Sequence, residues 1–536
     1  MSEQSKPPEG EGFSHEATPP AAGAAGAGSA GKTGSLRRAP VIAGAVALVM
    51  TGGIAALAGT GMLGSNAKQP EDVLPGDSII FAKADLDPGA AQKVSAFRLL
   101  DKLPDAKKAL SAEDPKKAVF EWAKSKDPDM SGVDYAADIE PWLGDRVGMS
   151  VLAPQGSDKE PVVVMALAVK DEAKAKEGIA RLQAKTKDAV AKVKDKAAGA
   201  SASPTKGGSE ENVQIYKDGY LLLTEKKNES RVRAALEQPT LAANETFKTD
   251  MAALGETGVA SGWVDGTQAM KLSGTTSMPA AMEELAGLSG RSAYALRFSS
   301  DYLELAQVNR GMKVQTKAAP LKDVTNLPAD TGAFYSFSGG SDYLGELWPT
   351  IKKFAAASGA GDVDEQLKAI EQQTGLVLPA DAQTLLGKQL DVVVAKQDFK
   401  NLQAMPKVGL RLWTDTAKAQ SIIDKLVKLG NSQGTAVPVQ TRVSGEHLDV
   451  GLDSPYLSAL GAGGDLSSAP GLKTVLPDLD KSVGALYVDL DAYESQYLDE
   501  VPAEQRELVK ALQAVGMTSQ PVQDGEQHST LRVSVN

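Results

Sequence analysis

Downstream of residue 74, short runs of alternating hydrophobic and polar residues are separated by longer runs with helical spacing. The stretch "LPGDSIIFAKADLD" (Leu74–Asp87) contains a proline turn followed by an alternating segment, which predicts a β-strand. Two strand pairs with tight turns, at Val213–Lys226 and Ser292–Val308, predict antiparallel hairpins. Strands of five to eight residues mixed with a few amphipathic helices predict an α+β fold with mainly antiparallel sheets.

The same order of segments occurs twice along the chain. The opening strand at Leu74–Asp87 returns as "LPADTGAFYSFSGG" (Leu327–Gly340). A Leu-Gly-strand segment and an aromatic-Val-Asp segment repeat in the same order, at 141–151 and 384–394, and at 261–270 and 485–494. We therefore predict two tandem related lobes, residues 74–312 and 313–536.

Each lobe also contains a D-x-A-K-A segment, at Asp171–Ala175 and at Asp415–Ala419. Aspartate accepts hydrogen bonds from the free amides of a first helical turn, so Asp171 and Asp415 are predicted N-caps of helices that follow strands. The apolar spacing predicts that these helices bury Ile179 and Leu182 in the first lobe, and Ile423 and Leu426 in the second.

The N-terminal part has a different pattern. Residues 1–38 have almost no apolar side chains to bury, which predicts a disordered tail. Residues 39–63 are uncharged and apolar over a length that can cross a bilayer, which predicts a transmembrane signal anchor, and 64–73 a linker. Lys32, Arg37 and Arg38 precede this span, so the positive-inside rule puts the tail in the cytoplasm and the lobes outside. A signal peptide cleaved after Ala58 is the alternative.

Composition narrows the chemistry. The 536 residues contain no cysteine and three histidines, which removes thiolate chemistry and leaves little for histidine-based catalysis or metal binding. The net charge of −12 makes nucleic acid an unfavourable partner, because an acidic body repels phosphates. We expect no cofactor and no metal.

The opening segment of the first lobe and "DYAADIEPWLGDRV" (Asp134–Val147) resemble an actinobacterial family catalogued as domain of unknown function 3352. The likeness covers most of residues 70–536. It implies a membrane-anchored surface protein and supplies no activity, ligand or catalytic residue.

Two nucleotide-binding or catalytic motifs match in letters but not in context. "GAGSAGKT" (Gly26–Thr33) fits a phosphate-binding loop, yet no strand precedes it. "GNSQG" (Gly430–Gly434) fits a nucleophile elbow, yet a helical pattern precedes Ser432 and predicts Gly430 as a helix C-cap. Of the histidines with which Ser432 could act, His528 is expected in a polar loop and His447 in a hairpin.

Two acidic segments are candidates for metal binding. Asp127–Asp138 has the oxygen spacing of a calcium loop, but Pro128, Asp134 and the short Asp138 depart from it, so an acidic loop is the favoured interpretation. The "DLD" segments at Asp85–Asp87 and Asp489–Asp491 place paired carboxylates on strands, although Asp87 before Pro88 is also a good helix N-cap.

These observations predict a non-catalytic, membrane-anchored binding or scaffolding ectodomain of the cell envelope, with an unknown protein or ligand as partner and an undetermined oligomeric state. The alternatives are a protein with an interlobe cleft for a lipid, glycan or small solute, and an envelope hydrolase using Ser432 and His528.

Overall fold

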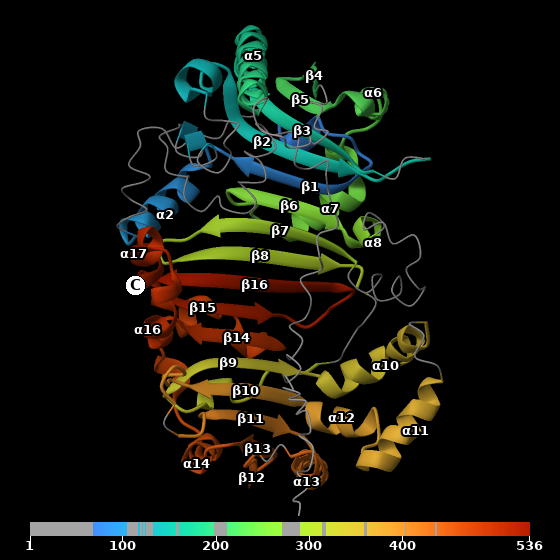
Figure 1. The fold of residues 1–536 in the computed structure, drawn as a ribbon, viewed down its shortest axis with the longest axis vertical. Helices are drawn as coiled ribbons and strands as arrows, with labels where there is room; N and C mark the ends of the chain where they lie inside the picture. The colour runs from blue at the N-terminus through green and yellow to red at the C-terminus, as the bar shows by residue number, and fades with distance from the viewer. Residues whose placement is uncertain are drawn as a thin grey trace, which may run out of the picture.

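The structure, a computed structural model, describes residues 68–536 except 104–115, 118–119, 122–123, 125–131, 157–159, 198–211, 271–289, 313–317, 358–361, 403 and 435–436. Its strands form one antiparallel sheet that runs the length of the molecule (Figure 1). The strands are β1 (Ser78–Asp85), β2 (Leu143–Leu152), β3 (Val162–Val169), β4 (Asn212–Lys217), β5 (Tyr220–Glu225), β6 (Ala260–Asp265), β7 (Arg291–Phe298), β8 (Tyr302–Arg310), β9 (Thr331–Ser338), β10 (Gln389–Ala395), β11 (Val408–Trp413), β12 (Gln440–Ser444), β13 (His447–Gly451), β14 (Gly484–Asp489), β15 (Leu512–Ser519) and β16 (Glu526–Val535).

Helices occupy the connections between these strands. They are α2 (Ala90–Asp101), α5 (Glu172–Ala197), α6 (Glu229–Leu236), α7 (Glu245–Ala253), α8 (Gly266–Met270), α10 (Gly340–Ala357), α11 (Val363–Thr374), α12 (Ala380–Leu386), α13 (Thr416–Ser432), α14 (Ser454–Ala462), α15 (Leu472–Val475), α16 (Glu494–Tyr497) and α17 (Arg506–Lys510), with a π-helical turn at Tyr135–Ile139. The predicted α+β class with antiparallel pairing is confirmed, and so are the two predicted hairpins, β4–β5 and β7–β8.

The strand order contains the predicted duplication. From one edge to the centre it is β4-β5-β3-β2-β1-β6-β7-β8, and from the other edge it is β12-β13-β11-β10-β9-β14-β15-β16. Each strand of the first half (β1–β8) thus has a counterpart at the same place in the second half (β9–β16). The two halves meet where β8 pairs with β16, and the pair Ala306–Thr530 is the middle of that seam. A pseudo-twofold axis passes through this point.

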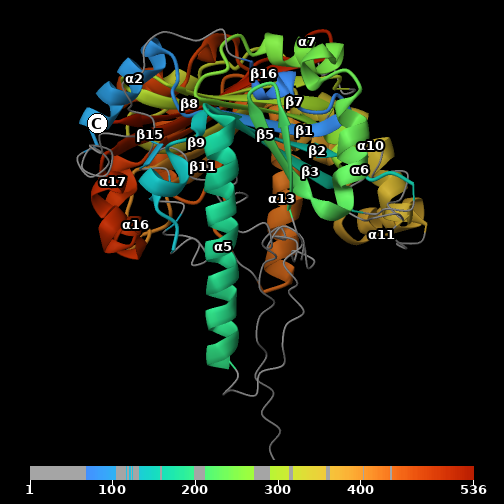
Figure 2. The same ribbon diagram turned by 90° about the horizontal axis from the view of Figure 1, so that it is seen from above.

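Side chains alternate between the two faces of the sheet, and different helices cover each face. On one face, α6 and α7 cover the first half and α14 and α15 the second, over cores that include Phe81 and Phe334. On the other face, α5 packs over Val147 and Leu167, and α13 over Leu412 and Leu448. Figure 2 shows α5 and α13 projecting from this second face as two arms.

One part of the predicted fold is corrected. Among the helices that the structure describes, none has both the length and the apolar composition needed to cross a membrane. The transmembrane helix of the predicted fold, and the single-pass signal anchor that depended on it, are therefore not supported. Residues 39–63, the tail 1–38 and the Gly26–Thr33 motif lie outside the described residues. The lobe boundary at residue 312 and the location outside the cytoplasm stay predictions.

Candidate functional site

The most extensive candidate site is a row of apolar side chains that crosses the arm-bearing face of the sheet. Strand registers place its members directly opposite one another from strand to strand. We call this set the apolar row: Leu221, Leu167, Val147, Ala84, Ala260, Leu296, Leu305, Leu531, Met517, Leu486, Tyr335, Val392, Leu410 and Val450. Every member is hydrophobic, so an apolar stripe continues across the seam between the two halves.

The two ends of the apolar row are buried, and its middle is not. Leu167 and Leu221 are at most 5% exposed beneath α5, and Val450 is buried beneath α13. In the middle, Leu305 is 38% and Tyr335 44% exposed. The members between them, on β16, β15 and β14, are half-buried, as is Val392 on β10. Six neighbouring strands thus present apolar side chains that the described residues leave partly open, and contiguous exposed apolar patches can mark interaction sites.

The α5 arm is fixed to the sheet at its base. Asp171 caps its first turn by accepting from the Lys174 amide (3.1 Å), as Asp415 does for α13 by accepting from the Lys418 amide (3.1 Å); both predicted caps are confirmed. Gly178 lies where any Cβ would be 2.4 Å from the indole nitrogen of Trp142, so glycine permits the close approach of the helix. The predicted burial of Ile179 and Leu182 is confirmed.

The arm carries positive charge on an acidic protein. The α5 sequence contains eight Lys or Arg residues against four Asp or Glu, whereas the whole chain has a net charge of −12. Two of its cations, Arg181 and Lys185, form ion pairs with Asp138 at the base of the arm. The buried end of the apolar row therefore lies beneath a cationic helix, and β1, β6 and β7 lie between this helix and the open part.

Behind the open row, the second half carries buried charges on the opposite face of the sheet. Asp391, Arg411 and Asp449 stand side by side on β10, β11 and β13, each at most 2% exposed. Arg411 Nε lies 3.3 Å from Asp449 Oδ1. Asp391 accepts hydrogen bonds from Gln389 (2.8 Å) and Trp413 (3.2 Å), and its burial raises the pKa of its carboxyl group. Of the strands that carry these charges, β10 also carries Val392 of the apolar row, on its other face.

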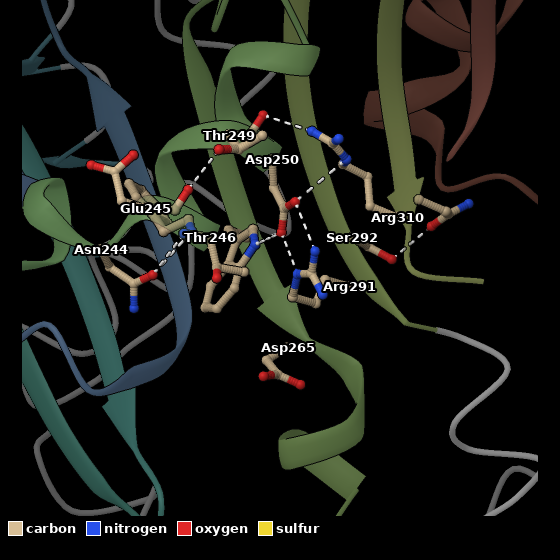
Figure 3. A network of polar contacts seen from close by, with 12 residues as sticks. Asn244, Glu245, Thr246, Thr249, Asp250, Asp265, Arg291, Ser292 and Arg310 are labelled. Carbon is tan, nitrogen blue, oxygen red and sulfur yellow. Dashed lines mark hydrogen bonds and ion pairs between the residues drawn. The ribbon is translucent and has the colours of Figure 1, made fainter. Parts of the chain in front are cut away.

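A second candidate site lies in the first half, on the face covered by α7. Its centre is Asp250 of α7, which is 2% exposed and accepts from Trp263 Nε1 (2.8 Å), Arg291 Nε (2.6 Å) and Arg291 Nη2 (3.2 Å) (Figure 3). Arg310 Nε lies 3.7 Å from the same carboxylate. The network holds α7 on β6, β7 and β8, and a cavity of about 330 Å³ opens beside it, lined in part by Trp263 and Asp265.

The structure does not bring the predicted hydrolase residues together. Ser432 is the last residue of α13 and donates to the Leu429 carbonyl (2.7 Å). The C-cap is Gln433, so the C-cap predicted at Gly430 is wrong by three residues. His528 lies on β16 rather than in a loop, and its Nε2 is 2.7 Å from Glu526. β16 is at the centre of the sheet and α13 at one end (Figure 1). His447 lies in the β12–β13 hairpin, as predicted.

The acidic segments have structural roles in the part of the chain that the structure describes. Asp138, the last oxygen of the candidate calcium loop, forms ion pairs with Lys185 and Arg181, and residues 127–131 lie outside the described residues. The predicted N-cap at Asp87 is wrong: α2 begins at Ala90 after Gly89, and Asp87 pairs with Lys93 (2.5 Å).

The remaining carboxylates of the two "DLD" segments also have polar partners. Asp85 accepts from the Asp87 amide (3.0 Å), Asp489 pairs with Lys396 (2.7 Å), and Asp491 accepts from Asn536 (3.3 Å). Across the described residues, no group of three or more His, Asp or Glu side chains is arranged to hold a metal ion.

Fold and sites together define an α+β protein built by duplication on one long antiparallel sheet, with an open apolar face between two helical arms. The model of the family described as "Protein of unknown function (DUF3352)" matches residues 41–448. This is more than half of the chain, so the chain belongs to that family, and the resemblance seen in the sequence is confirmed.

A solved structure titled "Structure of crystal form III of TP0453" is similar over 47% of this chain and 83% of that one, at 10% identity and a TM-score of 0.22, a likeness that carries no argument. No curated protein matches the chain.

Proposed function

We propose that this chain is a non-catalytic binding protein that uses the open middle of the apolar row to dock another protein. The observation that carries the proposal is the partial exposure of six aligned apolar side chains, from Leu305 to Val392, between the two arms. Sheet faces of soluble proteins are normally covered or polar, so an uncovered apolar face marks an interaction site.

The dimensions favour a protein over a small molecule. Six strands spaced about 4.8 Å apart span roughly 24 Å, and strands of six to ten residues add about 20–30 Å in the other direction. The product is about 480–720 Å² for the whole face, one end of which α2 covers at Leu303 and Val535, against the roughly 800 Å² that each partner contributes to a standard protein–protein interface. Small ligands, in contrast, bind in concave sites that enclose most of their surface.

Charge specifies the chemistry of the partner. The α5 arm is cationic, so the complementary surface has an apolar centre and acidic side chains where it meets α5. At the seam, where the alternative hypothesis expects an interlobe cleft, β8 and β16 pair directly.

Site-specific photo-crosslinking tests the proposal with a matched control. A photoreactive residue at Leu305 (38% exposed) is compared with one at Leu508 on α17 (37% exposed), in the full chain in its native cells. We expect a defined protein adduct from position 305 that is absent from position 508. The recovered partner, once purified, should then bind the chain at least about tenfold more weakly when Tyr335→Asp puts a charge on the face, and equally well in Leu508→Asp.

Two results would oppose this function. Identical adducts from positions 305 and 508 would show that crosslinking follows exposure alone. Unchanged affinity of the purified partner for Tyr335→Asp would show that the apolar row does not form the interface. If the adduct is a second copy of this chain, the face forms a homodimer, and the proposal of a different, acidic partner protein is wrong.

A further inference from the structure

The cavity beside α7 contains a carboxylate whose counterpart in the second half is paired with a lysine, and that lysine is absent from the equivalent position in the first half. It has a volume of about 330 Å³ and lies where β1, β6 and α7 meet. Its lining combines one apolar wall with several polar groups. Four of the lining residues are Asp265, Arg231, Ala153 and Trp263.

The second half of the chain contains an equivalent carboxylate, and its surroundings can be compared with those of Asp265. β6 and β14 both end in an aromatic-Val-Asp segment, Trp263–Asp265 and Tyr487–Asp489. In each, the aspartate Oδ1 accepts from the amide three residues further on, Gln268 N at 3.0 Å and Ala492 N at 3.1 Å. Asp265 and Asp489 are therefore equivalent residues with the same local geometry.

The two aspartates differ in their cation. Asp489 Oδ2 lies 2.7 Å from Lys396 Nζ, and this carboxylate is 1% exposed. Lys396 directly follows the pairing of Ala395 with Thr331. The equivalent pairing in the first half joins Leu152 to Ser78, so the position of Lys396 is occupied by Ala153. The first half thus has the equivalent acid but no lysine at the position of Lys396.

Arg291 lies opposite Asp265 on the neighbouring strand β7 and interacts with it electrostatically. No hydrogen bond or ion pair in this part of the chain reaches Asp265 Oδ2. Arg291, drawn beside Asp265 in Figure 3, is held by Asp250 at 2.6 and 3.2 Å. The cavity thus contains a carboxylate oxygen whose partner in the second half is a primary ammonium group.

The same cavity contains an unsatisfied group of the opposite charge. Arg231 donates through Nη2 to the Ala153 carbonyl, while its Nη1 is buried and has no hydrogen-bond partner in the described structure. No described ion pair joins Arg231 to Asp265. A buried donor without a partner is unfavourable, so a ligand acceptor at Nη1 would be favoured.

We propose that this cavity binds a small zwitterion of the α-amino-acid class. The ligand ammonium group takes the place that Lys396 Nζ has in the second half and pairs with Asp265. The ligand carboxylate accepts from Arg231 Nη1, and the side chain lies along Trp263. This site is separate from the apolar row, which lies on the other face of the sheet.

Calorimetric titration of the full-length chain tests the proposal. The probes are the standard α-amino acids, followed for each binder by its decarboxylated amine and its deaminated acid. We expect saturable one-to-one binding by at least one amino acid, and about tenfold or greater loss for both analogues, because each lacks one charge-assisted contact. The absence of any binding amino acid, or equal binding of either analogue, would overturn the proposal.

The most direct test is a substitution that introduces into the first half the lysine found at the equivalent position of the second half. Ala153→Lys supplies the missing ammonium group from the chain itself, so binding should be lost while the melting temperature stays equal or rises. Asp265→Asn should also lose binding, and Asp424→Asn, on the exposed surface of α13, should retain it. Retained affinity in a folded Ala153→Lys variant would contradict the assignment.

Discussion

Asp138 is the residue that ties the α5 arm to the sheet. Its side chain is 1% exposed and accepts from the Asp134 amide (2.9 Å), while Lys185 and Arg181 of α5 supply positive charge. Burial by itself would raise the pKa of this carboxyl group, but Lys185, the Asp134 amide and Arg181 together lower it below its ordinary value. Its ionised form therefore stabilises the folded state.

The lowered pKa of Asp138 predicts a pH-dependent effect of Asp138→Asn. We expect this variant to lose about 1–2 kcal/mol of unfolding free energy at pH 7, discounted because both cations are partly exposed. A carboxylate with a depressed folded pKa stabilises above its unfolded pKa of about 4 and loses this contribution as the pH falls through the folded value. The difference between wild type and variant, measured by urea unfolding, should therefore shrink below about pH 4. A difference that is constant from pH 7 to pH 3 would contradict this role.

At the residue scale, the sequence predicts what depends on near neighbours. The caps at Asp171 and Asp415 bond to amides three residues away, so a local pattern was enough to find them. Asp138 bonds to Lys185, 47 residues further along the chain, and its spacing within an acidic loop gave no sign of that partner. Only the comparison with Asp489 showed that the position of its lysine partner, Lys396, is occupied by Ala153 in the first half.

At the element scale, α5 and α13 are counterparts that bury different lengths of helix. In α5, Ile179 and Leu182 both pack into the core, because the π-helical turn at Tyr135–Ile139 and Trp142 extend that core along the arm. In α13, Ile423 is 8% exposed, but Leu426 is 40% exposed, so the predicted burial of Leu426 is wrong. Periodicity identifies the apolar side of a helix, whereas the length of helix that is covered depends on the elements packed against it.

Two truncations on α13 test this difference. Ile423→Ala should cost about 2–4 kcal/mol, because it leaves a cavity among Leu412, Leu448 and Val450. Leu426→Ala, three residues away and largely in solvent, should cost less than about 0.5 kcal/mol. Chemical denaturation of the two variants measures both values, and equal losses would mean that Leu426 is covered in solution.

At the scale of the whole molecule, the sequence predicted the duplication but not how the copies join. Gapless similarity between segments such as Leu74–Asp87 and Leu327–Gly340 revealed two copies with the same element order. Their union into one sheet depends on β8 pairing with β16, whose partners are more than 200 residues apart, as with Glu304 and Arg532. The apolar row emerges only from that union, because its open part lies on strands of both copies.

The seam between the copies makes a prediction about cooperativity. Glu304 of β8 is 8% exposed and holds Arg297 (2.9 Å) and, across the seam, Arg532 of β16 (2.9 and 2.8 Å). Glu304→Gln leaves two half-buried guanidinium groups without their shared carboxylate, which should cost about 2–3 kcal/mol. Glu507→Gln, which removes an exposed pair with Lys510, should cost less than about 0.5 kcal/mol.

Because the sheet is continuous across the seam and the hydrophobic cluster of Phe298 and Val535 spans it, Glu304→Gln should destabilise both copies together. Fluorescence from Trp263 reports on the first half and from Trp413 on the second, provided that each is observed in a variant in which the other tryptophans are phenylalanine. We expect both probes to follow one unfolding transition, and Glu304→Gln to lower both midpoints by the same amount. A shift of the Trp263 transition alone would mean that the halves unfold independently and that the open face can come apart at β8 and β16.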